Sequence, residues 1–128
     1  MTEKAYQFWN NLIGWTLFGL ALLTFGSTVE PTASYWDCAE YIATSAKLQV
    51  GHPPGAPFFQ MMGAFFASFA SSTEKIALMV NYMSVFSSAF TILFLFWTLT
   101  LILRKIPSFL GLESLSQKIG FFGSAAVG

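Results

Sequence analysis

The chain has 128 residues, of which 55% are hydrophobic and 9% are charged, and its formal net charge is zero. Soluble domains carry about 25% charged residues, so this composition excludes an ordinary soluble domain. A zero net charge without a basic run gives no support for nucleic-acid binding. The single cysteine, Cys38, excludes an internal disulfide, and no zinc-ligand spacing surrounds it.

The apolar residues lie in long runs that contain no Asp, Glu, Lys or Arg: residues 5–29, 48–73 and 76–103. A helix that crosses a bilayer needs roughly 20 apolar residues, so at least two of these runs can cross. We therefore predict an all-α integral membrane bundle with a first span at residues 8–28. Glu30-Pro31 should end that helix, since proline disfavours helical geometry in the residue before it.

A short amphipathic helix is predicted at residues 35–48. Ser34 would cap it, with Asp37 completing a capping-box pattern. Asp37, Glu40, Tyr41 and Thr44 then recur at helical spacing and share one face, opposite Trp36 and several aliphatic residues. Such a helix lies along a membrane surface with its acidic face turned to water or to a cavity.

The segment Gly51-His52-Pro53-Pro54-Gly55 should break the chain, because two prolines remove two amide donors and hold the backbone extended. A second short helix is predicted at residues 56–70. It is apolar nearly all round but too short to cross, so we expect it at the interface. Ser71-Ser72-Thr73-Glu74 is a second capping-box candidate, and it begins a span at residues 73–103.

The topology depends on whether residues 56–70 cross the bilayer. If they lie only at the interface, Arg104 and Lys105 fall on the cytoplasmic side, which short positively charged loops prefer. That arrangement also places Lys4 inside and makes residues 29–75 one external loop. Residues 104–117 would then form a cytoplasmic turn, and 118–128 would begin a further span. We expect the 128 residues to be the N-terminal part of a longer multi-span protein.

Candidate chemistry lies in the predicted external loop. Two neighbouring carboxylates such as Asp37 and Glu40 repel, so one tends to stay ionised while the other holds its proton. An ionised carboxylate can accept the proton of an attacking hydroxyl, and Lys47 or His52 can bind an anionic group such as a phosphate. The alternatives are structural: Asp37 only caps its helix, Glu40 pairs with a lysine, and His52 belongs to a turn.

Two motifs carry a resemblance to a known family. Tyr35-Trp36-Asp37-Cys38-Ala39-Glu40-Tyr41-Ile42-Ala43 and Leu48-Gln49-Val50-Gly51-His52-Pro53-Pro54-Gly55-Ala56-Pro57 resemble the start of the GT-C glycosyltransferase superfamily. Within it they are similar to a family of bacterial membrane proteins related to an animal endoplasmic-reticulum protein O-mannosyltransferase. Members of that family often have glycine where this chain has Ala39, a departure that leaves both acids in place.

The resemblance implies a catalytic acid at Asp37 with Glu40 beside it, and a donor-binding elbow at His52-Pro53-Pro54. The remaining substrate-binding candidates are Lys47, Trp36 and Tyr41. The resemblance also implies inverting transfer of a mannose-type sugar from a polyprenyl-phosphate carrier to a hydroxyl of an exported protein, with Asp37 as general base. The predicted partners are the bilayer, the lipid-linked donor and the protein acceptor.

The predicted location is the bacterial inner membrane, with the acidic loop on the periplasmic face. A single base suffices because the leaving lipid phosphate is already a stable anion, unlike the two-carboxylate chemistry of glycosidases. The sequence implies no definite cofactor; a phosphate-bound divalent metal ion stays open, although no ligand set for it is visible. Two other functions also stay open: a transporter whose acids bind substrate, and a non-catalytic scaffold that docks a partner.

Overall fold

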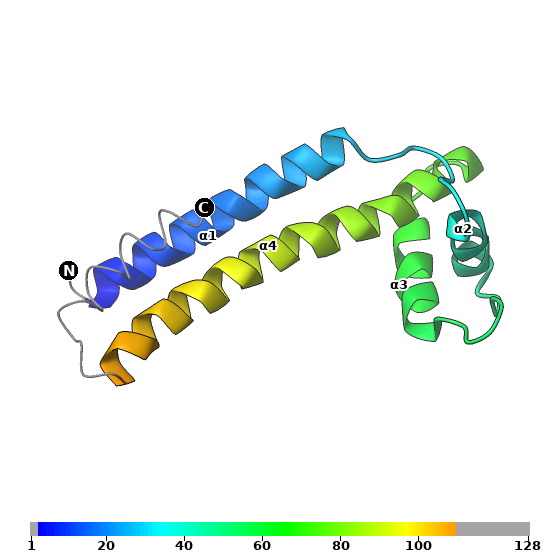
Figure 1. Ribbon diagram of the computed structural model, residues 1–128. Helices are drawn as coiled ribbons and strands as arrows, with labels where there is room; N and C mark the ends of the chain where they lie inside the picture. Colours follow the sequence, from blue (N-terminus) through cyan, green and yellow to red (C-terminus); the bar gives the residue numbers. More distant parts are fainter. Residues whose placement is uncertain (1–2, 110–128) are drawn as a thin grey trace. The chain divides into compact units, whose positions relative to one another are not determined.

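The computed structural model describes residues 3–109, and within that range it is helical and contains no strand (Figure 1). In chain order the elements are α1 (Glu3–Ser27), α2 (Cys38–Lys47), α3 (Pro57–Ala67), the 3-10 turn η1 (Thr73–Lys75) and α4 (Ile76–Phe109). Glu3–Ser27 and Thr73–Ile106 are long and apolar enough to cross a membrane. The prediction of an all-α fold with two candidate spans is confirmed.

The start of α2 differs from the prediction. The helix begins at Cys38 rather than at residue 35, so Ser34 does not cap it. Asp37 is the N-cap residue instead, and its side chain makes no capping hydrogen bond. Trp36, just before it, has a positive φ of 62°, and a residue in that region cannot continue a right-handed helix. The predicted capping box at Ser34 is therefore wrong.

Helix α3 is shorter than the predicted 56–70 and runs from Pro57 to Ala67. Pro57 occupies the start of the helix, where the amide hydrogen that proline lacks would have no partner in any case. Helix α4 is longer than predicted and continues through Arg104 and Lys105 to Phe109. The predicted turn at 104–117 is therefore helical in its first six positions, while the predicted span at 118–128 lies outside the described residues.

The structure divides into two compact units, of which the first combines residues 3–23 with the part of α4 from Ser88 onward. The two helical segments are antiparallel. Arg104 binds the carboxylate of Glu3 through two guanidinium nitrogens, and the rings of Phe18 and Phe90 lie 4.7 Å apart. Gly14 marks their closest approach, because a Cβ there would lie 2.6 Å from Nε1 of Trp97.

The second unit, Thr24–Ser87, contains α2, α3 and the start of α4. Helices α2 and α3 pack against each other, and their crossing is tight because a Cβ on Gly63 would lie 2.5 Å from the Ser45 hydroxyl oxygen. The ring of Phe66 on α3 contacts that of Phe86 on α4, with 5.9 Å between centroids. The Asn81 amide donates to the backbone carbonyl of Glu30, which ties the α1–α2 linker to α4.

Candidate functional site

Asp37, Glu40 and His52 form a partly exposed cluster beside the first turn of α2. One potential ligand atom from each residue lies within 4.8 Å of the others. Asp37 and Glu40 come from the start of α2, whereas His52 comes from the loop between α2 and α3. The structure therefore brings together three of the residues that the sequence predicted as site residues.

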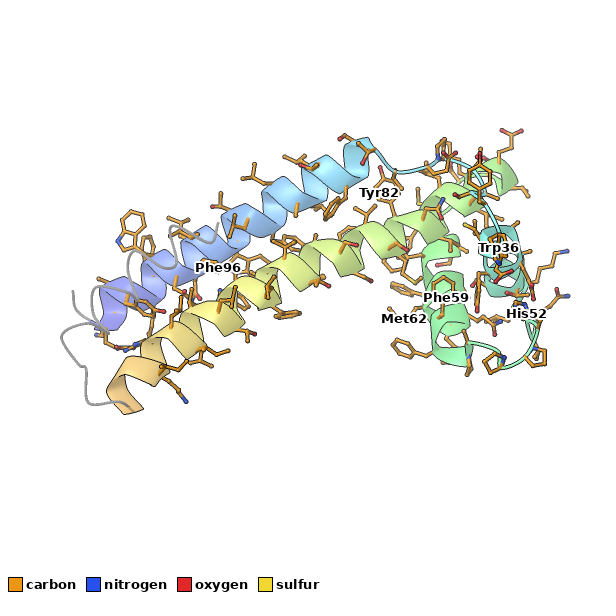
Figure 2. The ribbon with its side chains drawn as sticks, viewed as in Figure 1. Trp36, His52, Phe59, Met62, Tyr82 and Phe96 are labelled. Atoms are coloured by element: carbon orange, nitrogen blue, oxygen red, sulfur yellow. The ribbon has the colours of Figure 1, made fainter. Side chains whose placement is uncertain are left out.

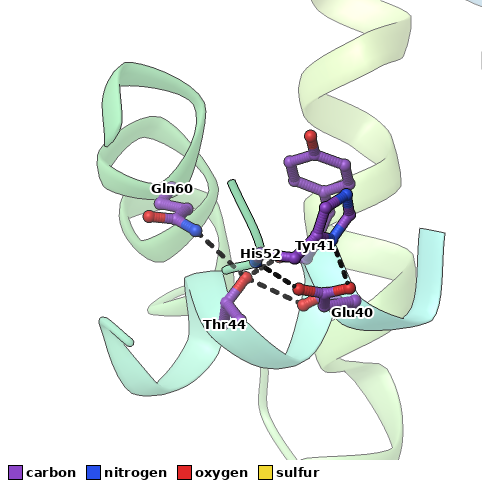
Figure 3. A network of polar contacts seen from close by, with 5 residues as sticks. All are labelled: Glu40, Tyr41, Thr44, His52 and Gln60. Atoms are coloured by element: carbon purple, nitrogen blue, oxygen red, sulfur yellow. Dashed lines mark hydrogen bonds and ion pairs between the residues drawn. The ribbon is translucent and has the colours of Figure 1, made fainter. Parts of the chain in front are cut away.

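Glu40 contacts His52 twice. Its Oε1 accepts the backbone N–H of His52 at 2.8 Å, and its Oε2 lies 2.8 Å from Nδ1 of the imidazole (Figure 3). Both side chains are partly exposed, at 40% for Glu40 and 49% for His52. A carboxylate that binds both the backbone and the ring of one residue fixes the position and the orientation of that residue.

The contact shifts the pKa values of Glu40 and His52 in opposite directions. Hydrogen bonds from the His52 backbone and side chain lower the pKa of Glu40 below its ordinary 4.5. The hydrogen bond to Glu40 and the negative charges of Glu40 and Asp37 raise the pKa of His52 above its ordinary 6.5. The pair therefore favours an ionised Glu40 and a protonated His52, in which Nδ1 donates to the carboxylate.

Gln60 holds the same loop from α3. It is buried, and its amide faces the backbone of Gln49 and Gly51. In the orientation that satisfies both, it donates to the Gln49 carbonyl (3.2 Å) and accepts the Gly51 N–H (3.1 Å). In the other orientation it donates to the Thr44 hydroxyl at 3.4 Å (Figure 3). Hydrogen bonds to Glu40 of α2 and Gln60 of α3 thus hold residues 49–52 in place.

Gly51 is enclosed between these two anchoring side chains. A Cβ at this position would lie 3.2 Å from the Gln60 amide nitrogen and 3.2 Å from Oε1 of Glu40. A side chain there would make tight contacts, so Gln60 or Glu40 would have to shift by a few tenths of an ångström, and glycine avoids this at the close approach of the loop to α2 and α3.

Sequence reasoning missed Gln60. A signal was present, because Gln60 is the one amide-bearing or charged side chain in the otherwise apolar α3 segment PFFQMMGAFFA. A lone polar residue on an apolar helix usually has a buried polar partner. Here that partner is loop backbone, which no side-chain pattern reveals.

The other predicted site residues lie around the cluster rather than in it. Lys47 is exposed in the last turn of α2, roughly 10 Å along the helix axis from Glu40 at 1.5 Å per residue. Tyr41 packs edge-on against Phe59 of α3, with 5.1 Å between ring centroids, and helps to join the two helices. Pro53 and Pro54 are exposed and joined by a cis peptide bond.

Trp36 has an unusual backbone conformation, and its side chain is exposed. Its φ of 62° is in the left-handed region, which costs an L-residue with a side chain roughly 1–2 kcal/mol. The indole is 92% exposed, so packing against the described residues offsets little of that cost. Glycine would adopt this conformation freely.

The cluster has the residue types of a metal site, and one of its contacts, between Glu40 and Nδ1 of His52, suits a shared proton. Carboxylate oxygens and imidazole nitrogens are common ligands for divalent ions. However, Nδ1 of His52 is the nitrogen that faces Glu40 at 2.8 Å, and a protonated nitrogen cannot ligate a metal. Metal binding at this atom would require loss of the shared proton and separation of the pair.

The fold and the cluster together define a class of protein. It is a helical membrane protein in which an acidic cluster and two short helices lie between two candidate spans. Residues 37–128 match the family described as Protein O-mannosyl-transferase TMEM260 N-terminal domain, and the chain belongs to that family. The match begins at Asp37 and so includes the whole cluster. The predicted relation to a protein O-mannosyltransferase family is confirmed.

One curated relative has a name similar to that of the matched family. The Dictyostelium discoideum protein named Protein O-mannosyl-transferase tmem260 is 29% identical over 86 residues, which covers 66% of this chain and 10% of that protein. The chain therefore spans about a tenth of this relative's length. No solved structure matches the chain. Family membership and two membrane-crossing candidates indicate an integral membrane protein.

Proposed function

We propose that the complete protein is a membrane glycosyltransferase that moves a mannose-type sugar from a polyprenyl-phosphate carrier to a hydroxyl of an exported protein. The family relation supports transfer to protein, since both the matched family and the curated relative are named as protein O-mannosyltransferases. The lipid carrier suits a site in the segment that connects two candidate spans, because the carrier's chain can stay in the bilayer while its phosphate reaches that segment.

The observation that carries the assignment of roles is the unequal use of the two carboxylates. Both oxygens of Glu40 are engaged by His52. The carboxylate of Asp37 lies in the same cluster, and it makes no capping hydrogen bond to the start of α2. A general base needs a carboxylate oxygen that can reach the substrate hydroxyl. We therefore assign the base to Asp37, and to Glu40 the positioning of the His52 elbow.

The proposed step is a single displacement. The acceptor hydroxyl oxygen forms a bond to the anomeric carbon while Asp37 takes the hydroxyl proton. The bond between the anomeric carbon and the phosphate oxygen breaks on the opposite face of the sugar ring, so the configuration is inverted. The electron pair leaves with the lipid phosphate, a stable anion that needs no protonation by an acid. Protonated His52 adds a positive charge on the side where an anionic carrier arrives.

The exposed face of α3 supports a location at the membrane surface. Its exposed apolar side chains recur at helical spacing: Phe58, Met61, Met62 and Phe65, with Phe69 just beyond the helix. A stripe of this kind lies in the boundary between headgroups and acyl chains. We propose that residues 29–75 form the external loop of a bacterial inner-membrane protein and face the periplasm.

The test is Asp37→Asn in the full-length protein, with transfer measured from a polyprenyl-phosphate mannose donor to a serine- and threonine-containing protein acceptor. Loss of a general base should lower the rate by roughly 10²–10⁴-fold. Glu74→Gln, which neutralises an exposed acid in η1, is the matched control and should leave the rate unchanged. The product anomer, read by NMR, should be inverted relative to the donor. Retained activity in Asp37→Asn removes the proposed role.

A further inference from the structure

Trp36 combines three properties that the fold itself does not explain. It directly precedes the proposed base Asp37, its backbone has a φ of 62°, and its indole is 92% exposed. A strained conformation persists where the surroundings gain from it, and such positions gather at functional sites. The exposed indole packs little against the described residues, so these residues supply little to offset the strain.

The bilayer is one candidate occupant, since indole rings favour the membrane interface. The second unit argues against it. Figure 2 shows Trp36 and His52 at α2, whereas Met62 projects from the side of α3 that faces away from α2. Met62 belongs to the exposed apolar stripe of α3, which is the surface suited to lipid. If that stripe enters the bilayer, Trp36 lies on the side where the ionised cluster is, and ionised carboxylates avoid hydrocarbon.

A sugar ring fits this position better. The C–H groups on one face of a pyranose carry small positive charges and pack on the negative face of an aromatic ring. Its hydroxyls can donate to the Asp37 carboxylate, and its ring and hydroxyl oxygens can accept from His52, which lies in the same cluster. An exposed indole next to ionised groups therefore offers both kinds of contact that a carbohydrate needs.

We infer that Trp36 is the stacking platform for the sugar of the lipid-linked donor, and that it sets the preference for the sugar-bearing carrier over the bare carrier. The inference rests on the proposed function and adds a specificity-determining residue to it. The left-handed turn at Trp36 places the ring at the start of α2, immediately before the base.

The test is a binding measurement on the full-length protein in lipid nanodiscs, without acceptor, so that no turnover occurs. The two probes are polyprenyl-phosphate mannose and the same polyprenyl phosphate without sugar. Wild type should bind the sugar-bearing carrier more tightly. Trp36→Leu should weaken that binding about tenfold, or ~1.4 kcal/mol, and leave binding of the bare carrier unchanged. Trp36→Phe should retain most of the preference.

The neighbouring Tyr35 is a matched control. It is also 92% exposed but is not among the residues with positive φ, and Tyr35→Leu should leave both affinities unchanged. Trp36→Gly tests the strain directly. It should lose the preference for the sugar while melting at the same or a higher temperature, because glycine adopts φ near 60° without cost.

Several outcomes would overturn the inference. An equal loss for both carriers would assign Trp36 to lipid or membrane contact. In the transfer assay proposed for Asp37→Asn, a change in Trp36→Leu confined to the KM of the protein acceptor would assign Trp36 to the acceptor. A lower melting temperature for Trp36→Gly would assign the indole to the fold. If wild type prefers the sugar-bearing carrier yet transfers nothing, the proposed function fails while the inference stands. If the protein transfers mannose but Trp36→Leu keeps the wild-type preference for the sugar-bearing carrier, the inference fails while the proposed function stands.

Discussion

Glu40 and His52 are twelve positions apart and are joined by two contacts of 2.8 Å, one to the backbone amide and one to the imidazole. The first contact can form with a neutral ring, whereas the second is strongest when the ring is protonated and helps to hold the first in place. Glu40 thus ties the proline elbow to the first turn of α2, and it also raises the pKa of the ring that it holds. Of the two acidic residues predicted as a catalytic pair, Glu40 is the one that binds His52.

Glu40→Gln should separate these two effects. A glutamine oxygen can still accept the His52 backbone N–H but carries no charge, so the pKa of His52 should fall back toward 6.5, its ordinary value. Transfer should fall less than in Asp37→Asn, by roughly 10-fold if one charge-assisted contact worth about 1.4 kcal/mol is lost. The His52 pKa can be measured by NMR from the pH dependence of its ring signal. That signal is assigned by its absence in His52→Gln. An unshifted His52 pKa would show that Glu40 does not set the charge.

The contribution of the pair to stability should depend on pH in a defined window. The pKa of Glu40 is lowered on folding, so its contribution is present above its ordinary 4.5 and is lost as pH falls through the lowered value. The pKa of His52 is raised, so its contribution is full below 6.5 and is lost as pH rises through the raised value.

The window therefore extends from about the ordinary pKa of Glu40 to that of His52. Protection of the His52 amide from hydrogen exchange, corrected for the intrinsic rate, should be greatest inside this window and fall on both sides. His52→Gln should remove the decline on the alkaline side and keep the acidic one. Protection that rises steadily from pH 6 to pH 9 would contradict the assigned directions.

Gly63→Ala should loosen the crossing of α2 and α3. The added Cβ would lie 2.5 Å from Oγ and 2.8 Å from Cβ of Ser45, and overpacking of this kind costs about 1–3 kcal/mol. Ser45→Ala alone should not lower the melting temperature, because it removes a buried hydroxyl that has no hydrogen-bond partner. Thermal unfolding of the full-length protein in detergent measures both. A Gly63→Ala variant as stable as wild type would contradict the close crossing.

Gly14 and Gly19 provide a matched pair in α1. A Cβ on Gly14 would meet Nε1 of Trp97 at 2.6 Å and Cδ1 of Leu93 at 3.1 Å, whereas a Cβ on Gly19 meets nothing within 4 Å. Gly14→Ala should therefore destabilise the packing of α1 on α4. Gly19→Ala should be neutral or slightly stabilising, because alanine favours the helix. Melting temperatures in detergent compare the two, and equal shifts would count against the close approach at Gly14.

Chelation tests the divalent-metal alternative. Because Nδ1 of His52 is held by Glu40, we expect transfer activity to change less than about twofold, a small free-energy difference, after EDTA treatment and dialysis. Added Mg²⁺, Mn²⁺ or Zn²⁺ should not raise it. Loss of activity on chelation, with recovery on metal addition and sensitivity to Glu40→Gln, would instead assign a cation to the cluster.

Much of the architecture followed from local chemistry in the sequence. Long uncharged runs and helix-compatible residues determined two candidate spans, and the proline elbow at residues 51–55 separated the two short helices. The charged segment around Asp37 and the elbow at His52 identified the region that contains the cluster. Composition and helical periodicity act on neighbouring residues, so they can be read without knowledge of the fold.

Tertiary structure decided the rest, because it depends on which distant residues meet. The left-handed backbone at Trp36 moved the start of α2 to Cys38 and made Asp37 its N-cap. The return of the loop brought His52 to Glu40, which left the two carboxylates in different environments. Gln60 holds that loop through backbone groups that no side-chain pattern reveals. Spacing along one helix placed the two acids side by side, and only the fold showed that His52, twelve positions further on, binds Glu40.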